Sequence, residues 1–189
     1  MWESLIEKDQ QFFIFLNNLG SPFWDPFWLA MSDKWVALPL YGLLLFLAIR
    51  DLGWKRTALF VVFIALLITC TDQLSNFFKY GMQRFRPCYE PSLDGMVRLV
   101  KSSCGGRYGY FSAHAANSFG LATYFAVFWR NTHRTWAVLL LFWALLVAYS
   151  RIYLGVHYPL DVLSGCLAGG LLGWIFSRLF LRADQRLFR

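Results

Sequence analysis

The chain has 189 residues, of which 58% are hydrophobic and 20% are aromatic, more apolar material than the core of one soluble domain needs. Its formal net charge is +7, but the sequence contains no soluble basic domain and no basic strands with interleaved aromatic residues, which excludes a nucleic-acid partner. Charged residues lie between long apolar runs, so we expect a single membrane domain over residues 1–189 whose partners are membrane lipids, with no obligatory protein partner.

The first 33 residues do not have the pattern of a clean membrane crossing. Residues 2–19 mix apolar and charged positions, which predicts an amphipathic helix at the membrane interface. Residues 23–31 are aromatic but include Asp25 and Pro26, so an interfacial or partly inserted segment is favoured over a true crossing. We therefore expect residues 1–33 to form an amphipathic, interfacial N-terminal segment.

Five apolar runs follow, each near the roughly 20 residues that a bilayer crossing requires once polar ends are included. They are residues 35–49, 57–78, 115–129, 135–149 and 159–180. In the last run Gly165, Gly169 and Gly173 recur every four residues, which favours close packing against a neighbouring helix of the same chain over a dimer contact. The sequence thus predicts an all-α fold, a polytopic membrane helical bundle with five transmembrane helices plus an N-terminal interfacial or sixth membrane segment.

A polar stretch, residues 79–111, connects the second and third apolar runs and is interrupted by glycines and prolines. A connection this long usually carries a function, so we expect it to form an active-site loop. Cys88 and Cys104 lie within it and could form a disulfide, which would require an oxidising compartment. Two reduced thiols are the alternative.

Three polar clusters stand at the ends of these runs, and counting the runs puts all three on the same side of the membrane. They are Lys79 with Arg84 and Arg86, then Ser112 with His114, and finally Ser150 and Arg151 with His157 and Asp161. So many cations and two histidines with few acids would repel one another unless a multiply charged anion lay between them, which favours phosphate. Ser112 and Pro159 also suit helix starts, whose positive ends attract an oxyanion.

His157 and Asp161 are four residues apart across the start of a helix. This spacing lets the carboxylate orient one imidazole nitrogen and leaves the other nitrogen free to attack. His114 would then protonate the departing oxygen. Taken alone, Arg84 is interpreted as a topology anchor or snorkelling side chain, the usual role of an arginine at the end of a span.

Together these residues resemble the three-part signature of the type 2 phosphatidic acid phosphatase superfamily. The matching motifs are Lys79 through six residues to Arg86-Pro87, then Ser112-Ala113-His114, then Ser150-Arg151 through five residues to His157, with Asp161 after three more. The second motif of the family often has glycine where this chain has alanine. The resemblance covers about residues 57–180, which would form the phosphatase core, and six-helix membrane cores are usual in the family.

The resemblance implies hydrolysis of a phosphomonoester or pyrophosphate without a metal or other cofactor. His157 would form a phosphohistidine, Asp161 would orient it, and His114 would be the general acid. The phosphate would be bound by the backbone amide of Ala113 and by the side chains of Lys79, Arg86, Ser112 and Arg151. We therefore predict an integral membrane lipid phosphatase.

Positive residues outside the three clusters indicate the orientation. Lys55, Arg56, Arg130, Arg134, Arg178, Arg182 and Arg186 share one side by span counting, which the positive-inside rule assigns to the cytoplasm. The site would then face the periplasm or exterior of a bacterial inner membrane. Undecaprenyl pyrophosphate is the favoured substrate there, with phosphatidylglycerol phosphate, phosphatidic acid and a lipid A phosphate as alternatives.

Two other functions use the same residues. A lipid phosphotransferase would pass the phosphate to a second lipid or sugar, and a phosphate- or lipid-binding transporter would release its ligand intact. Asp72 is the main ionisable residue inside a span, and it shares a helical face with Asn76 and Lys79, so we interpret it as a support for Lys79. A zinc or magnesium site is disfavoured because no ligand set has metal spacing.

Overall fold

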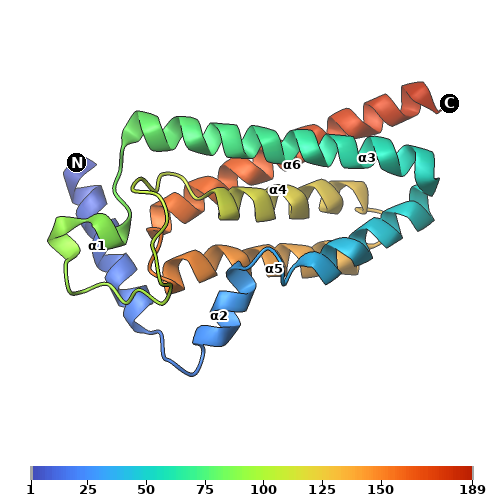
Figure 1. Ribbon diagram of the computed structural model, residues 1–189. Helices are drawn as coiled ribbons and strands as arrows, with labels where there is room; N and C mark the ends of the chain where they lie inside the picture. The colour runs from blue at the N-terminus through green and yellow to red at the C-terminus, as the bar shows by residue number, and fades with distance from the viewer. Residues whose placement is uncertain (1, 189) are drawn as a thin grey trace.

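The computed structural model describes residues 2–188, and within them it contains α-helices, two single-turn 3₁₀ helices and no strand. The α-helices are α1 (Trp2–Asn18), α2 (Asp25–Ser32), α3 (Leu38–Met82), α4 (Ala113–Phe128), α5 (Arg134–Tyr153) and α6 (Pro159–Leu187). Helices α3 to α6 run along the long axis of the molecule, and α1 lies across one end (Figure 1). The all-α prediction is confirmed.

Helix α3 folds back on itself at Gly53 (Figure 1). Gly53 has φ 70° and ψ 164°, a backbone conformation that residues with a side chain rarely adopt. The hydroxyl of Thr57 donates to the carbonyl of Ala48 at 3.0 Å and to that of Gly53 at 2.8 Å, which ties the two arms together at the bend. The predicted runs 35–49 and 57–78 are therefore the two arms of one hairpin.

Helices α3, α5 and α6 are long and apolar enough to cross a membrane. Helix α4 has 16 residues and is about 24 Å long, less than the ~30 Å thickness of the hydrocarbon layer. The prediction of five crossings therefore stays a prediction. For residues 23–31 the interfacial alternative remains favoured over a sixth crossing, because α2 has only eight residues and reaches about 12 Å.

Large apolar side chains cover the outer faces of the long helices, as expected for surfaces in contact with lipid. More than half of the side chains of Phe46, Val62, Phe142, Leu145, Leu167 and Leu171 is exposed. The interior is also apolar and is centred on the fully buried Phe60 of α3. Its ring contacts those of Tyr124 at 4.7 Å and Phe180 at 5.0 Å between centroids, which joins α3 to α4 and α6.

The glycine strip of α6 faces α4 within the same chain, as predicted. Gly165, Gly169 and Gly173 lie against the backbone of Ser112, Ala116 and Gly120. A Cβ atom added at Gly169 would fall on the carbonyl group of Ala116, far inside van der Waals contact. The two helices thus touch through their main chains, which brings the start of α4 beside the start of α6.

We expect Gly169→Ala to destabilise the protein, because the new methyl group has no space against Ala116. Overpacking of this kind costs about 1–3 kcal/mol, measurable as a lower midpoint of thermal unfolding in detergent. Gly170→Ala is the matched control, since its Cβ would meet only the hydroxyl of Thr123, at 3.8 Å. Equal midpoints for the two variants would contradict the close packing of α4 on α6.

Candidate active site

The predicted site residues meet at the end of the bundle where the α3–α4 loop, the start of α4, the end of α5 and the start of α6 come together (Figure 1). Gly109 of the loop lies among three of them. A Cβ atom on Gly109 would be 3.1 Å from Cγ of Arg86 and from Oδ2 of Asp161, and 3.6 Å from Nδ1 of His157. The backbone amide of Ser112 donates to the carbonyl of Asp161 at 3.0 Å.

His157 and Asp161 are both buried and face each other, with 3.5 Å between Nδ1 and Oδ2. Asp161 is held in place because it also caps α6: its Oδ2 accepts the backbone amide of Tyr158 at 3.1 Å, and Pro159 occupies the first turn. The Tyr-Pro-Leu-Asp sequence thus starts the helix and presents the carboxylate to His157. Nδ1 faces the acid, so Nε2 is the ring nitrogen available for attack.

The surroundings of His157 favour its neutral form. Burial, together with the cations Arg86, Arg151 and Lys79 close by, lowers the pKa of His157 well below its usual value of about 6.5. Since the neutral imidazole is the nucleophilic form, the side chain is ready to react at pH 7. The sequence predicted these three cations to bind phosphate, so the predicted phosphate site lies next to His157.

This low pKa predicts the pH dependence of the reaction. Protonation of His157 removes the nucleophile, so kcat/KM should fall only at a pH well below about 6.5. Substrate phosphate also ionises near pH ~6, so a variant of the enzyme is needed to separate the titration of His157 from that of the substrate. Arg86→Gln removes a cation that lowers the pKa, and should move the acid limb to higher pH. An unchanged acid limb in that variant would contradict the assignment.

The cations of the site have few partners of opposite charge. Arg151 is 4% exposed; it donates one bond to the hydroxyl of Ser32, and its Nε has no partner among the residues that the structure describes. Arg86 donates to the carbonyls of Cys104 at 2.5 Å and Tyr108 at 3.2 Å, and burial lowers its pKa. Lys79 forms no ion pair within residues 2–188. Such a group suits an oxyanion.

The start of α4 adds backbone and hydroxyl donors. Ser112 is the N-cap, with its hydroxyl 3.5 Å from the amide of Ala115, and Ala113 is the first helical residue. Its amide is among the first donors of the helix, which lack intrahelical acceptors and suit an anion. His114 follows, with an exposed side chain that lines a cavity.

The similarity to known proteins agrees with this geometry. A family model of the PAP2 superfamily matches residues 56–185, most of the chain. The chain belongs to the PAP2 superfamily. A protein of Bacteroides thetaiotaomicron named lipid A 4'-phosphatase is 39% identical to it over 99% of this chain and 83% of its own length. A protein of the same name from Porphyromonas gingivalis is 33% identical, over 97% of this chain and 78% of its own.

The solved structures lead to the same family. The crystal structure of Aquifex aeolicus LpxE matches with a TM-score of 0.65 and 27% sequence identity, covering 89% of this chain and 93% of that one. This PAP2 protein is therefore a membrane lipid phosphatase. Within residues 2–188 no group of three His, Cys, Asp or Glu side chains is arranged to hold a metal ion.

Two residues of the PAP2 site were not identified as such from the sequence. Arg84 donates to Oδ1 of Asp161 at 2.8 Å and to Oδ2 of Asp9 at 2.6 Å, and its guanidinium lies 4.1 Å from the ring centre of Tyr158. The other oxygen of Asp9 accepts the amide of Leu160 at 2.9 Å. The interpretation of Arg84 as a topology anchor is wrong, because its side chain is largely buried and bridges α1 to Asp161.

The N-terminal helix packs against the site end of the bundle through one buried face. Asp9, Phe13 and Asn17 recur every four residues on α1 and are all buried. Phe13 packs edge-on against Tyr158, 5.4 Å between ring centres, and Asn17 donates to the carbonyls of Ile152 and Tyr153. The four-residue spacing of these side chains puts them on one helical face, but a solvated amphipathic face has the same spacing, so the sequence did not show that this face was packed.

A disulfide joins Cys88 and Cys104 in the α3–α4 loop, with 6.4 Å between the Cα atoms. It lies next to Arg86, which is predicted to bind phosphate, since the carbonyl of Cys104 accepts a hydrogen bond from this arginine. The covalent link joins two residues 16 positions apart, which reduces the conformations that the unfolded chain can adopt. It thereby supports the loop position from which Arg86 reaches the site.

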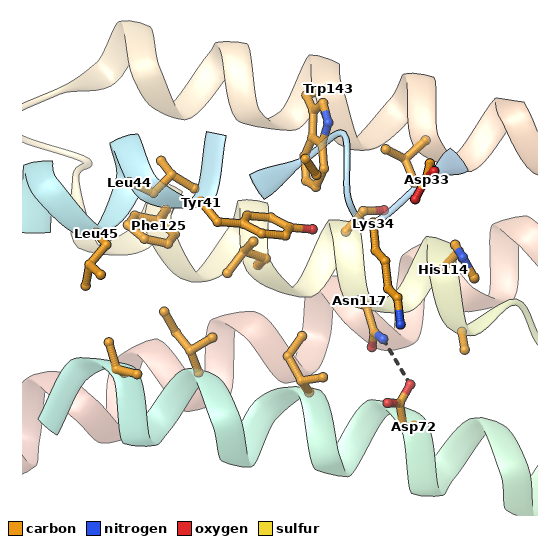
Figure 2. Close-up of a pocket in the computed structure, with 18 of the residues that line it drawn as sticks. Asp33, Lys34, Tyr41, Leu44, Leu45, Asp72, His114, Asn117, Phe125 and Trp143 are labelled. Atoms are coloured by element: carbon orange, nitrogen blue, oxygen red, sulfur yellow. Dashed lines mark hydrogen bonds between the residues drawn. The ribbon is translucent and has the colours of Figure 1, made fainter. Parts of the chain in front are cut away.

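A cavity of about 610 Å³ extends from the PAP2 site between α3, α4 and α5 (Figure 2). The end of the cavity nearest the site is lined by Ser32, Ala113 and His114, and Asp72 and Asn117 follow. Deeper walls are apolar, with Leu44, Leu121, Phe125, Trp143 and Val147. Its position and lining suit the hydrocarbon part of a lipid attached to a phosphate at the site.

Proposed function

We propose that this PAP2 phosphatase removes a phosphate from the sugar head group of lipid A, at the 4′ position. The observation that carries the proposal is the 39% identity, over 99% of this chain, to a protein named lipid A 4'-phosphatase. A lipid A phosphate was one alternative from the sequence, and it replaces undecaprenyl pyrophosphate as the favoured substrate.

In the proposed reaction Nε2 of His157 attacks phosphorus and the bond to the 4′ oxygen of the sugar breaks. His114 gives its proton to that oxygen, so the sugar leaves as an alcohol and the phosphoryl group stays on His157. Water, activated by the now neutral His114, then attacks the phosphohistidine and releases inorganic phosphate. The 3.5 Å approach of Asp161 to Nδ1 supports its role in orienting His157.

The charges around His157 support phosphate binding in this reaction. Lys79, Arg86 and Arg151, with the hydroxyl of Ser112 and the amide of Ala113, would hold the three outer oxygens as charge builds up in the transition state. The Nε of the buried Arg151 has no partner within residues 2–188 and is available for such an oxygen. These groups would supply the stabilisation that a metal ion supplies elsewhere, so we propose a metal-independent mechanism.

We propose further that the site faces the periplasm of a bacterial inner membrane. The disulfide between Cys88 and Cys104 lies at the site end of the bundle and favours an oxidising compartment. Lys55 and Arg56 lie beyond the bend at Gly53, at the opposite end, where the positive-inside rule places the cytoplasm.

The function is tested with purified protein in detergent micelles containing EDTA. Lipid A with a 4′-phosphate, undecaprenyl pyrophosphate and phosphatidylglycerol phosphate are compared by release of inorganic phosphate, and mass spectrometry locates the phosphate lost. We expect the highest kcat/KM for lipid A, with the 4′-phosphate removed and no loss of rate on chelation. A higher kcat/KM for either other lipid would reject the substrate, and inactivity in EDTA restored by a divalent cation would reject metal independence.

A further inference from the structure

Asp72 and Asn117 form a polar pair inside the largely apolar cavity (Figure 2). Nδ2 of Asn117 donates to Oδ1 of Asp72 at 2.9 Å, and the hydroxyl of Thr71 donates to Oδ1 of Asn117. Asp72 forms no ion pair with any residue between 2 and 188. Its carboxylate is only partly buried and lines the cavity, so it has acceptor capacity left for a ligand.

The pair lies one helical turn deeper in the cavity than His114. Asn117 follows His114 by three residues on α4, and Leu121 and Phe125 continue the same wall. Asp72 stands opposite, on α3, above a wall of aliphatic side chains. The cavity therefore has a short polar section next to the site and an apolar section beneath it.

This order of polar and apolar walls restricts the leaving group. His114 would protonate the oxygen that departs with the lipid, so the group attached to that oxygen must pass Asp72 and Asn117. A hydrocarbon chain at this point would remove water from the carboxylate and offer no hydrogen bond in return, which is costly inside a membrane. A hydroxyl or amide N–H would instead donate to the carboxylate, in a charge-assisted hydrogen bond.

We propose that Asp72 and Asn117 form a subsite for the hydroxyl and amide groups of a phosphorylated sugar head group, directly beside the phosphate that is cleaved. The subsite rests on the proposed function and adds the feature that separates a glycolipid phosphate from an isoprenyl phosphate. Asp33 and Lys34 also line this end of the cavity, but both are exposed, in the segment between α2 and α3. Asp72 is therefore the acceptor within the membrane-embedded wall.

The test compares wild type with Asp72→Asn on lipid A with a 4′-phosphate, phosphatidylglycerol phosphate and farnesyl phosphate, in the same detergent. Loss of the charge weakens the hydrogen bond to the sugar, so kcat/KM for lipid A should fall about tenfold or more. For farnesyl phosphate kcat/KM should stay constant or rise, which also shows that the variant is folded. Asp94→Asn, which removes an exposed carboxylate outside this cavity, should leave every rate unchanged.

The remaining outcomes are each decisive. A loss shared by phosphatidylglycerol phosphate, but not farnesyl phosphate, supports the subsite and extends it to glycerol hydroxyls. An equal loss on all three lipids overturns it, since Asp72 would then act on the phosphate through Lys79, and no loss on any lipid overturns it as well. If wild type does not cleave lipid A, the proposed substrate is rejected. The loss of kcat/KM in Asp72→Asn on phosphatidylglycerol phosphate, compared with that on farnesyl phosphate, then still tests the subsite.

Discussion

Replacing His157 with asparagine should reduce phosphate release by about 10⁴- to 10⁶-fold, the loss found when a covalent nucleophile or its partner base is removed. The side chain is buried beside Asp161, and a carboxamide there can neither attack phosphorus nor form a phosphoryl intermediate. The measurement is turnover of lipid A under saturating conditions. His133→Asn is the matched control, because His133 lies between α4 and α5 at the far end of the bundle, 3.1 Å from Asp51.

Wild type and His157→Asn also test whether a phosphohistidine intermediate forms. Wild type mixed briefly with substrate labelled in its phosphate, and quenched in alkali, should retain label on His157, because phosphohistidine survives alkali and is lost in acid. The His157→Asn protein should retain none. Label on His114 in place of His157, or turnover by the asparagine variant at the wild-type rate, would overturn the assignment of the nucleophile.

Replacing Arg84 with glutamine should reduce both activity and stability. Arg84 is the common partner of Asp161 and Asp9, and its side chain is only 15% exposed. Its loss leaves two buried carboxylates without their cation, which costs about 3–5 kcal/mol of folding stability. Asp161 would lose its position against His157, and a displacement of that order lowers kcat by about 10²-fold. Because both ion pairs of Arg84 are to carboxylates of the protein and we do not propose that it binds phosphate, KM should change little.

Arg107→Gln is the control for this variant, since Arg107 is an exposed arginine of the same loop that lies 4.8 Å from the ring of Phe85. Asp9→Asn should lower kcat less than Arg84→Gln, and the two changes together should cost less than the sum of the separate losses, as expected for partners. A rise in KM without a fall in kcat would indicate that Arg84 binds substrate rather than positioning Asp161.

The all-helical fold and the glycine contact between α4 and α6 could be predicted because each produces a regular pattern in the sequence. Apolar runs of about 20 residues indicate helices in lipid, and Gly165, Gly169 and Gly173 mark one face at helical spacing. The residues around His157 could be predicted for a different reason. Their types and spacings within three short motifs match one family, and the structure brings them to one end of the bundle.

The missed features depend on contacts between distant segments, which no local pattern records. Asp9 and Arg84 are 75 residues apart, and an acid in an amphipathic helix equally suits a solvated face. The sequence also did not predict that the first two apolar runs form one hairpin with a sharp bend at Gly53, because the length of the runs does not show how tightly they are connected.

The main-chain contact between α4 and α6 makes these two helices a more rigid unit than the rest of the bundle. Helices that touch through their backbones cannot slide or separate by side-chain rearrangement, so Ser112, His114 and Asp161 keep their relative positions as one rigid unit. The facing wall of the cavity comes from the α3 hairpin, whose arms meet at the glycine bend. Any rearrangement that admitted a lipid from the bilayer would therefore fall on this hairpin, and Ser112, His114 and Asp161 would keep their relative positions.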